Sequence, residues 1–413
     1  MTATPPAAPR LRSDRDFLLF LTSRSVAVLG SAISAVALPL LVFRLSGSPL
    51  VTSTVAAVQV MPYLLFGLLA GAVADRAPRR TLMVAAQACA AVALASVPAA
   101  ATIGELHTAH MVTVAAVVAT SFVWFDAAAF GALPTLVGTD RIVAANSAIW
   151  TVTTLLGVGA PALGGLLVSV LGAPRALALD AGSYVAAGLL LALIGRSMDP
   201  ARTADDSAPA RTGTVCADIA EGLRFLFGQP LIRSLTLLGI GNSLTGGAVT
   251  ALLVVLVVDT LDLPADGRWY GILLAAVALG GLLAALALPR LSGRIRIGTI
   301  TLAGLTACPV AVLAVAAAPG PGRLIVPLLL WSTASTLVIL NGITARQRLT
   351  PDRLQGRVNT TARMVAWGGT PLGALAAGGL AEIVDVRLAL VISATAVTVS
   401  AITGWWSPLR THT

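Results

Sequence analysis

Two ionisable side chains stand inside long runs of apolar residues, where a charge is unfavourable. Asp126 follows Phe125 and precedes a run of alanines, and Arg24 lies in the first long apolar run of the chain. Hydrocarbon penalises an unpaired charge, so ionisable residues within a membrane are candidates for function. We expect Asp126 and Arg24 to form a switchable pair that binds a proton or a cationic substrate. The alternative is a static buried pair that sets the register of two helices.

Uncharged polar and aromatic residues supply further candidates for a solute pathway. Amides can hydrogen-bond a solute, and aromatic rings can stack on it. A largely apolar cavity with few charges fits a bulky amphipathic solute better than a sugar or an amino acid. The residues that we expect to line such a cavity, beside Asp126 and Arg24, are Gln59, Asn242, Asn341 and Trp124. We expect two further acids, Asp180 and Glu382, to lie near the outer face in contact with solvent.

The chain offers little for enzyme chemistry. His107 and His110 lie in one short connection with only Glu105 nearby, so a solvated loop is a better interpretation than a metal site. The three cysteines are isolated and lack the spacing of metal ligands. No glycine-rich phosphate loop follows a strand, and no serine or cysteine nucleophile has an evident base. We therefore predict neither an enzyme nor a bound cofactor or metal.

The elements that position these residues are membrane spans. Of the 413 residues 57% are hydrophobic and 11% are charged, and the mean hydropathy is +0.90; about a quarter of a soluble domain is charged. We predict an all-α membrane protein with twelve transmembrane helices, because runs long enough to cross a bilayer recur at 17–43, 50–74, 81–103, 109–137, 143–171, 175–196, 232–258, 268–290, 296–318, 323–345, 357–381 and 386–407.

The placement of basic residues predicts the orientation of these spans. All 27 basic residues are arginines, and the formal net charge is +9. They gather at both tails, in the even-numbered connections and in the central segment, so the positive-inside rule places both termini in the cytoplasm of a plasma-membrane protein. Arginines beside apolar runs match lipid headgroups better than nucleic acid. We expect the bilayer, a small-molecule substrate and protons as partners, no nucleic acid, and a monomer.

The chain divides into two halves of six apolar runs. A polar segment rich in proline and acid separates them, and 218–226 has the pattern of an amphipathic helix on the membrane surface; docking on a partner is the alternative. The expected units are a cytoplasmic tail (1–16), an N-terminal six-helix bundle (17–196), a linker with the amphipathic helix (197–231), a C-terminal six-helix bundle (232–407) and a second tail (408–413).

Matching residues recur in the two halves at a common offset, close to half the chain length. Pro161 within a glycine-rich run has its counterpart in Pro371, and the pair Asp140-Arg141 recurs as Asp352-Arg353. Weak parallel repeats of this kind are typical of transporters that hold a substrate path between two bundles.

The most specific motif in the sequence is the short connection after the second apolar run. Gly67 and Gly71 share a helix face that a neighbouring backbone can approach closely. The helix then ends in Asp75-Arg76 and, after a proline, Arg79-Arg80, and the next run starts at once. Asp75 requires an arginine, a helix N-terminus or water. One interpretation is that these charges only set topology; the other is a latch between the two bundles.

This connection resembles the loop 2–3 signature of the major facilitator superfamily, G-x-x-x-D-R-x-x-R-R. The stretch from Gln59 to Pro62 and the start of the chain are similar to the drug and siderophore exporters of that superfamily, of the macrolide-efflux and enterobactin-exporter types. The resemblance covers residues 17–406. It implies two six-helix bundles, with spans 1, 4, 7 and 10 lining the cavity between them.

The resemblance also implies roles for single residues. Asp75 would cap the N-terminus of span 11 near Arg357, and Arg76 or Arg80 would pair with Asp140. The expected latch comprises these five residues together with Gly71 and Arg79. The fifth span resembles the antiporter signature of the superfamily. Glycine permits close packing and proline frees a carbonyl, so the residues expected to act as a hinge or a tight seal are Pro161, Gly164, Gly165 and Pro371; ordinary packing is the alternative.

These features predict a secondary active efflux transporter. It would exchange protons for an amphipathic small molecule, such as an antibiotic, another drug or a siderophore, by alternating access. No nucleotide-binding domain is present in the sequence, so ATP would not drive it within this chain. An uptake permease is the first alternative, because a fold does not set direction. A membrane scaffold or sensor without transport is the second.

Overall fold

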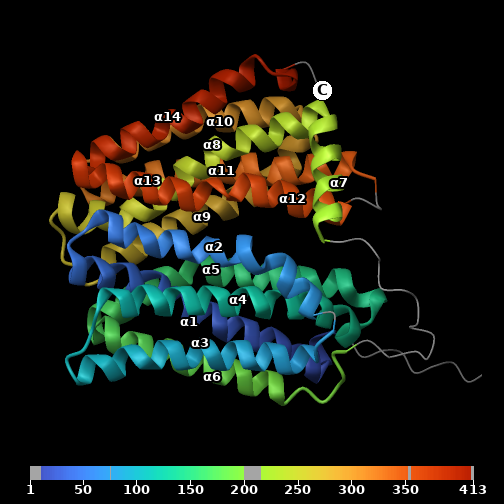
Figure 1. Ribbon diagram of the computed structural model, residues 1–413, viewed down its shortest axis with the longest axis vertical. Coiled ribbons are helices and arrows are strands. Elements are labelled where there is room, and N and C mark those ends of the chain that lie inside the picture. The colour runs from blue at the N-terminus through green and yellow to red at the C-terminus, as the bar shows by residue number, and fades with distance from the viewer. Residues whose placement is uncertain (1–10, 75, 200–214, 352–354, 411–413) are drawn as a thin grey trace, which may run out of the picture.

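Long helices run side by side through the molecule, because in lipid a helix satisfies its own backbone hydrogen bonds. The computed structural model describes residues 11–74, 76–199, 215–351 and 355–410. In the first half, the helices are α1 (Arg15–Ser46), α2 (Pro49–Ala74), α3 (Arg79–Thr102), α4 (Thr108–Val137), α5 (Ile142–Leu171) and α6 (Ala173–Ala192) (Figure 1).

The second half begins with an amphipathic helix and continues with seven more. They are α7 (Val215–Gly228), α8 (Pro230–Val255), α9 (Arg268–Ser292), α10 (Ile297–Ala317), α11 (Pro321–Leu349), α12 (Gln355–Trp367), α13 (Gly369–Ile383) and α14 (Val386–Trp405). A π-helical turn, Leu256–Thr260, extends α8. The amphipathic segment predicted at 218–226 falls within α7, which packs on α12 and α8.

Eleven of the described helices are long and apolar enough to cross a membrane. The remaining span, predicted as one helix over 357–381, is instead two pieces, α12 and α13. Pro371 has no N–H to pair with the carbonyl of Trp367, where α12 ends, so the backbone breaks there. The other predicted spans coincide with observed helices to within a few residues. The all-α architecture is therefore confirmed, with α12 and α13 together forming one of twelve spans.

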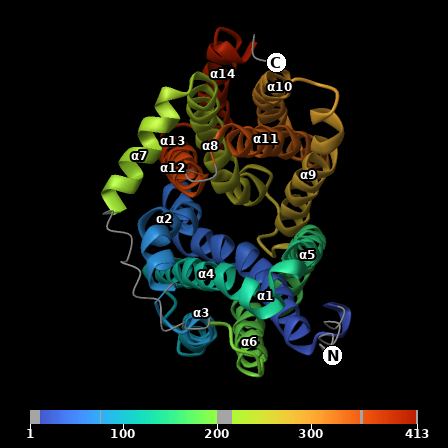
Figure 2. The ribbon, with the colours of Figure 1, turned by 90° about the vertical axis from the view of Figure 1, so that its right-hand side faces the viewer.

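The helices form two bundles that lie side by side (Figure 2). Helices α1–α6 pack on one another in the first bundle, and α8–α14 in the second. The two bundles meet mainly along two helix pairs, α5 with α9 and α2 with α13. The arrangement of two six-span bundles that the sequence predicts is thus confirmed.

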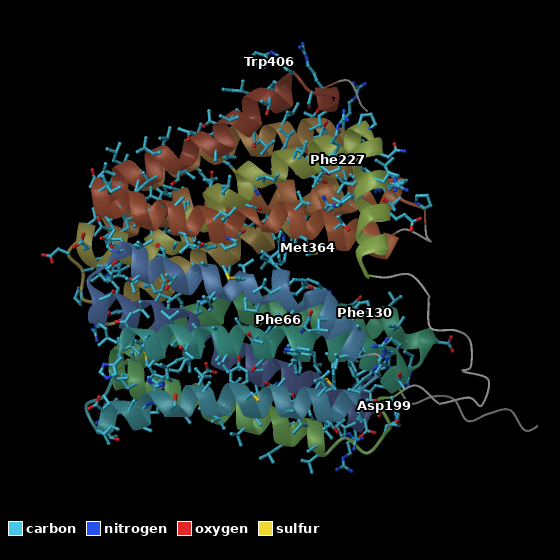
Figure 3. The ribbon with its side chains drawn as sticks, viewed as in Figure 1. Phe66, Phe130, Asp199, Phe227, Met364 and Trp406 are labelled. Atoms are coloured by element: carbon cyan, nitrogen blue, oxygen red, sulfur yellow. The ribbon has the colours of Figure 1, made fainter. Side chains whose placement is uncertain are left out.

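Both ends of the described chain lie at one end of the bundles, which we call the tail side. It also holds α7 and the α2–α3 connection, and it is on the right in Figure 1. Asp199 and Phe227, labelled in Figure 3, lie near this side. The connections between α1 and α2, α5 and α6, and α13 and α14 lie at the other end, which we call the far side. Two of the most exposed large apolar side chains, Phe130 and Trp406, are 86% and 83% exposed.

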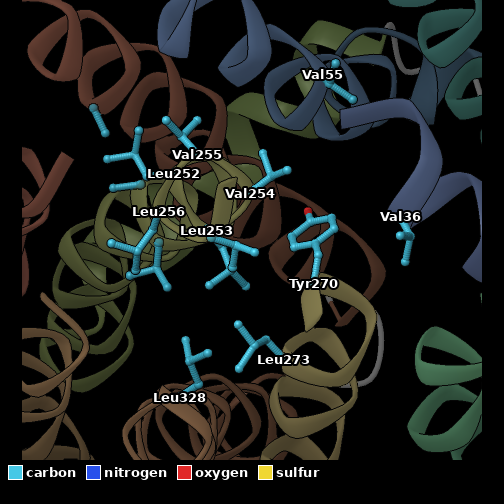
Figure 4. Packing of buried hydrophobic residues seen from close by; sticks show 14 of the residues in the cluster. Val36, Val55, Leu252, Leu253, Val254, Val255, Leu256, Tyr270, Leu273 and Leu328 are labelled. Carbon is cyan, nitrogen blue, oxygen red and sulfur yellow. The ribbon is translucent and has the colours of Figure 1, made fainter. Parts of the chain in front are cut away.

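The apolar core joins the two halves only toward the far side. The largest buried cluster includes Val36 and Val55 of the first half together with Val254, Tyr270 and Leu273 of the second (Figure 4). At the tail side, one cluster lies wholly in the first half and a smaller one wholly in the second. Among the described residues, the bundles are therefore packed together at the far side and separate at the tail side.

Candidate functional site

The guanidinium of Arg24 and the carboxylate of Asp126 meet in the tail-side part of the first bundle. Nη2 of Arg24 on α1 lies 3.6 Å from Oδ1 of Asp126 on α4. The guanidinium also lies over the ring of Phe125, 5.4 Å from its centroid. The two side chains are 20% and 40% exposed, so the pair is loose and open to solvent. The structure thus brings together the two residues that the sequence predicts as partners.

Trp124 lies beside this pair but lines a different space. It borders an open, almost entirely apolar groove of about 540 Å³ between α3 and α4. Arg24 borders a smaller cavity of about 60 Å³ enclosed by α1, α3, α4 and α6. Ser121 lines both spaces. Gln59 is exposed on α2 and borders neither of them.

The two asparagines predicted to face a cavity are instead buried inside the second bundle. Asn242 is 2% exposed, and its Nδ2 donates to the carbonyl of Ser335 at 3.5 Å. Asn341 is 1% exposed and donates to the carbonyl of Ile297 at 2.8 Å and to Oγ1 of Thr301 at 2.9 Å. Their amides hold α8, α10 and α11 together. The prediction is wrong in this conformation, because a buried amide needs partners and the neighbouring helices provide them.

The basic residues after α2 bind within the first bundle. Nη1 of Arg79 donates to the carbonyl of Gly131 at 2.8 Å, and the backbone N–H of Arg79 donates to Oδ1 of Asp199 at 2.8 Å. Nη2 of Arg80 donates to the carbonyl of Arg196 at 2.7 Å. These contacts fasten the start of α3 to α4 and to the segment after α6.

The structure tests the predicted latch only in part. Asp75 lies outside the described residues, as does the side chain of Arg357, so the capping of span 11 stays a prediction. Arg76 and Asp140 are both exposed, and within the described ranges no ion pair joins Asp140 to Arg76 or Arg80. The pairing predicted for Asp140 is wrong here, because the Arg80 guanidinium is satisfied by a backbone carbonyl instead.

The glycine face of α2 makes no close helix contact. A Cβ at Gly71 would have no heavy atom within 4 Å, and one at Gly67 would meet only the ring of Tyr63. The prediction that a neighbouring backbone lies close to these glycines is wrong in this conformation. The physical reason is that the bundles are separate at the tail side, where this part of α2 lies.

A charge cluster at the tail side was not predicted from the sequence. Asp14 is 2% exposed, caps α1 through the N–H of Phe17, and accepts from Nη1 of Arg141 at 3.3 Å and of Arg196 at 3.2 Å. Burial raises the pKa of Asp14, but the hydrogen bonds from Arg196 and Phe17 and the two arginine charges outweigh it and lower the pKa overall. An aspartate directly before a long apolar helix is the sequence signal for such a cap.

Two glycines near the far-side end of α5, Gly164 and Gly165, pack against neighbouring backbones, and Gly165 does so across the interface between the bundles. A Cβ at Gly165 would lie 2.9 Å from Cα of Gly271 on α9, and one at Gly271 would lie 2.5 Å from the carbonyl oxygen of Pro161. Gly164 packs in the same way on the backbone of Ala32 in α1. The contact with α9 places Gly165 at the interface between the bundles; its role as hinge, seal or ordinary packing residue stays a prediction.

The second far-side interface joins α2 to α13. The carboxylate of Glu382 on α13 accepts from the hydroxyl of Ser48 and, at 3.3 Å, from the N–H of Leu50 at the start of α2. A Cβ at Gly378 would lie 2.5 Å from Oγ of Ser53. Glu382 is exposed, as expected, but it also bridges the two bundles. The sequence does not predict this bridge, because it depends on how the two bundles meet.

Asp180 has a different environment from the expected one. It was predicted in solvent near the outer face, yet it is 0% exposed, and it lies near the midpoint of α6. Its carboxylate accepts from the hydroxyl of Ser34 on α1 and, at 3.1 Å, from that of Ser183. The prediction is wrong because α6 packs this face against α1 and α3 rather than turning it outward.

The chain is similar to known transporters in both sequence and fold. A family model described as transmembrane secretion effector matches residues 6–413. The multidrug efflux pump Tap of Mycolicibacterium fortuitum is 29% identical over 379 residues, which are 88% of this chain and 89% of the pump. The enterobactin exporter EntS of Escherichia coli is 28% identical over 256 residues, 61% of this chain and 58% of the exporter. The nucleoside transporter NupG shares the fold, with a TM-score of 0.78 at 14% identity over 96% of this chain and 100% of that structure.

Proposed function

Because the chain belongs to the transmembrane secretion effectors of the major facilitator superfamily, we propose that it exports an amphipathic small molecule in exchange for protons. Relatives named as a multidrug efflux pump and an enterobactin exporter support export over uptake. The one-sided packing of the bundles is the observation that carries the proposal. A carrier that works by alternating access must close one side while the other is open.

We place the tail side in the cytoplasm, as the arginine distribution predicts. The far-side seal then faces outward, and the separate tail-side cores correspond to a conformation that takes up its solute from the cell. Glu382 and Gly165 would hold the outer side shut in this conformation. We propose that the bundles at 17–196 and 232–407 rock as units, joined by the linker 197–231.

The proposed binding group is the Arg24–Asp126 pair. At 3.6 Å and with Asp126 40% exposed, the pair is weak and accessible. A cationic solute or a proton can therefore replace Arg24 as the partner of Asp126 without a large loss of stability. Phe125 offers a ring beside the pair for the apolar part of such a solute.

The proposed latch acts when the bundles rock the other way. As the tail side closes, Asp75 would cap the first turn of α12 near Arg357, where the positive end of the helix dipole favours a carboxylate. Gly71 would then meet its neighbour closely, as its missing Cβ allows. The break between α12 and α13 before Pro371 lets the tail-side piece of this span move separately.

Inside-out vesicles with an imposed proton gradient test this function. A pH-sensitive dye reports the gradient while antibiotics, dyes and siderophores are added one at a time. We expect at least one compound to release the gradient, and Asp126→Asn to abolish the release; Asp259→Asn, an exposed acid at the far side, is the control. Compounds that cross without moving protons would contradict the coupling and favour an uptake permease. No transport of any kind would favour a scaffold.

A further inference from the structure

The carboxyl of Asp180 occupies a prepared site in the middle of the first bundle. Its two described hydrogen-bond partners are the hydroxyls of Ser34 and Ser183. A Cβ at Gly30 would overlap both the Asp180 carboxylate and Ser183, so the missing side chain of Gly30 makes the space for this group. Unlike the pair at Asp126, which is open to solvent, Asp180 is 0% exposed.

The groups around Asp180 do not neutralise a negative charge there. Within the described residues, no ion pair involves Asp180. On α6 its titratable neighbours are Tyr184, one turn away, and Arg175, which is exposed near the helix start. On α1 the one nearby cation is Arg24, which pairs with Asp126. The facing part of α3 contributes the amide of Gln87, and α5 carries no ionisable residue.

Such a carboxyl is stable in the protonated form and unstable as an isolated ion. Removing a carboxylate from water without a cation is strongly unfavourable, and a buried acid avoids this by binding a proton. A hydroxyl can both donate and accept a hydrogen bond. Ser34 and Ser183 can therefore donate to the carboxylate, and one of them can accept from the O–H once a proton binds. The site thus accommodates both protonation states.

A route for protons leads from this site toward Arg24. The cavity of about 60 Å³ is lined by Arg24 and Ser31 of α1, Gln87 of α3 and Tyr184 of α6. Its walls are mostly apolar, but these four side chains give water hydrogen-bond partners, and the cavity is large enough to hold water. Tyr184 links the cavity to Asp180, because residues four apart on a helix lie on the same face. Water in this cavity would connect Asp180 with the Arg24–Asp126 pair.

We propose that Asp180 is a proton-binding site of the transport cycle, reached through this cavity, and that it is filled in the conformation sealed at the far side. One proton binds one carboxylate oxygen, and the same proton leaves when the rearrangement of α1 and α6 admits water. This inference rests on the proposed proton exchange. It assigns the proton to Asp180 and leaves the Arg24–Asp126 pair to the solute.

Infrared difference spectroscopy of the reconstituted full-length protein tests the site without any solute. A protonated carboxyl has its own C=O stretching band, and a pH step reveals which carboxyls gain or lose a proton. Other carboxyls contribute bands as well, so we expect one component of the difference spectrum to disappear in Asp180→Asn and to remain in Asp126→Asn. Ser183→Ala should shift the band without removing it, because it changes one hydrogen bond only. A difference spectrum that Asp180→Asn leaves unchanged at every pH would overturn the proposal.

The vesicle assay separates this inference from the proposed function. Asp180→Asn preserves size and hydrogen-bonding capacity, so a merely structural role predicts normal transport. We expect solute to cross down its own gradient in Asp180→Asn while release of the proton gradient is lost. If the band belongs to Asp180 but no compound moves protons in the unaltered protein, the proton site stands and the exchange fails. If exchange is normal in Asp180→Asn, the coupling proton binds elsewhere.

Discussion

The Arg24 side chain makes two contacts at once, with the Asp126 carboxylate and with the Phe125 ring. A planar guanidinium can stack on a ring and still donate at its edge, whereas a lysine ammonium is a compact point charge. Arginine at this position is therefore not interchangeable with lysine, although both keep the positive charge.

Arg24→Lys should reduce transport efficiency although the charge is preserved. A cation–π contact is worth about 0.5–2 kcal/mol, so we expect a loss of roughly 2- to 30-fold in kcat/KM for a compound identified in the vesicle assay. Phe125→Leu should give a similar loss, and the double variant little more, because both remove the same contact. Fully additive losses would show that the ring and the guanidinium act independently.

The ionisation of Asp14 should make the stability of the fold depend on pH. Its folded-state pKa is lowered below the usual 3.8, so its ionised form stabilises the fold. The stabilisation is fully present above about pH 4 and is lost as the pH falls through the lowered pKa.

We expect Asp14→Asn to destabilise the protein at neutral pH by about 1.5–3 kcal/mol, the usual range for hydrogen bonds to charged groups. The difference should shrink in acid, as followed by thermal unfolding in detergent. Asp385→Asn is the control: Asp385 caps α14 through the N–H of Leu388 but is exposed and binds no arginine in the described contacts. A pH-independent difference at Asp14 would contradict the charge argument.

At the scale of elements, the proposed far-side seal depends on close contact between helix backbones. Helices α5 and α9 approach so closely at Gly165 and Gly271 that neither position has room for a Cβ. Dispersion contacts between close backbones hold membrane helices together, since lipid provides no hydrophobic driving force between them.

Gly165→Leu should prevent full closure of the far side. Val36→Cys, placed in the seal where the native side chain is 0% exposed, should then react in intact cells with a maleimide that cannot cross the membrane. The matched control is Gly159→Leu on the same helix, because a Cβ at Gly159 meets nothing within 4 Å. Equal labelling in both variants would show that Gly165 is not needed for the seal.

At the scale of the whole molecule, transport requires two states of similar stability. The far-side contacts favour the state described above, so a counterpart must stabilise the state closed at the tail side. The proposed counterpart is the Asp75 cap on α12. Without it, the balance would move toward the tail-open state.

Asp75→Asn should therefore insert normally and transport slowly. Coupling energies of this kind are about 1–3 kcal/mol, which corresponds to roughly 5- to 150-fold in turnover or in the population of the tail-closed state. Vesicle transport normalised to expression measures the turnover. Normal turnover of a well-expressed Asp75→Asn protein would remove the latch from the mechanism.

The helical spans, their number and the division into two halves could be read from the sequence. Apolar runs of sufficient length become helices in lipid whatever their neighbours are, because the backbone has no other partner. The depth of each residue along its span was also predictable. The sequence therefore predicts that Arg24 and Asp126 lie at a similar depth and can pair. The break before Pro371 was missed, because a proline can bend a span without interrupting it.

Which side of each helix faces inward was decided only by the tertiary structure. Asp180 and Asn242 stand in runs that are apolar all round, so periodicity does not identify their buried face. Packing of α6 against α1 and α3 buries Asp180, and packing of α8 against α11 buries Asn242. The partners of Glu382 and Arg80 likewise depend on chain segments more than a hundred residues away. Local sequence determines that a helix forms, whereas long-range packing determines what each of its side chains touches.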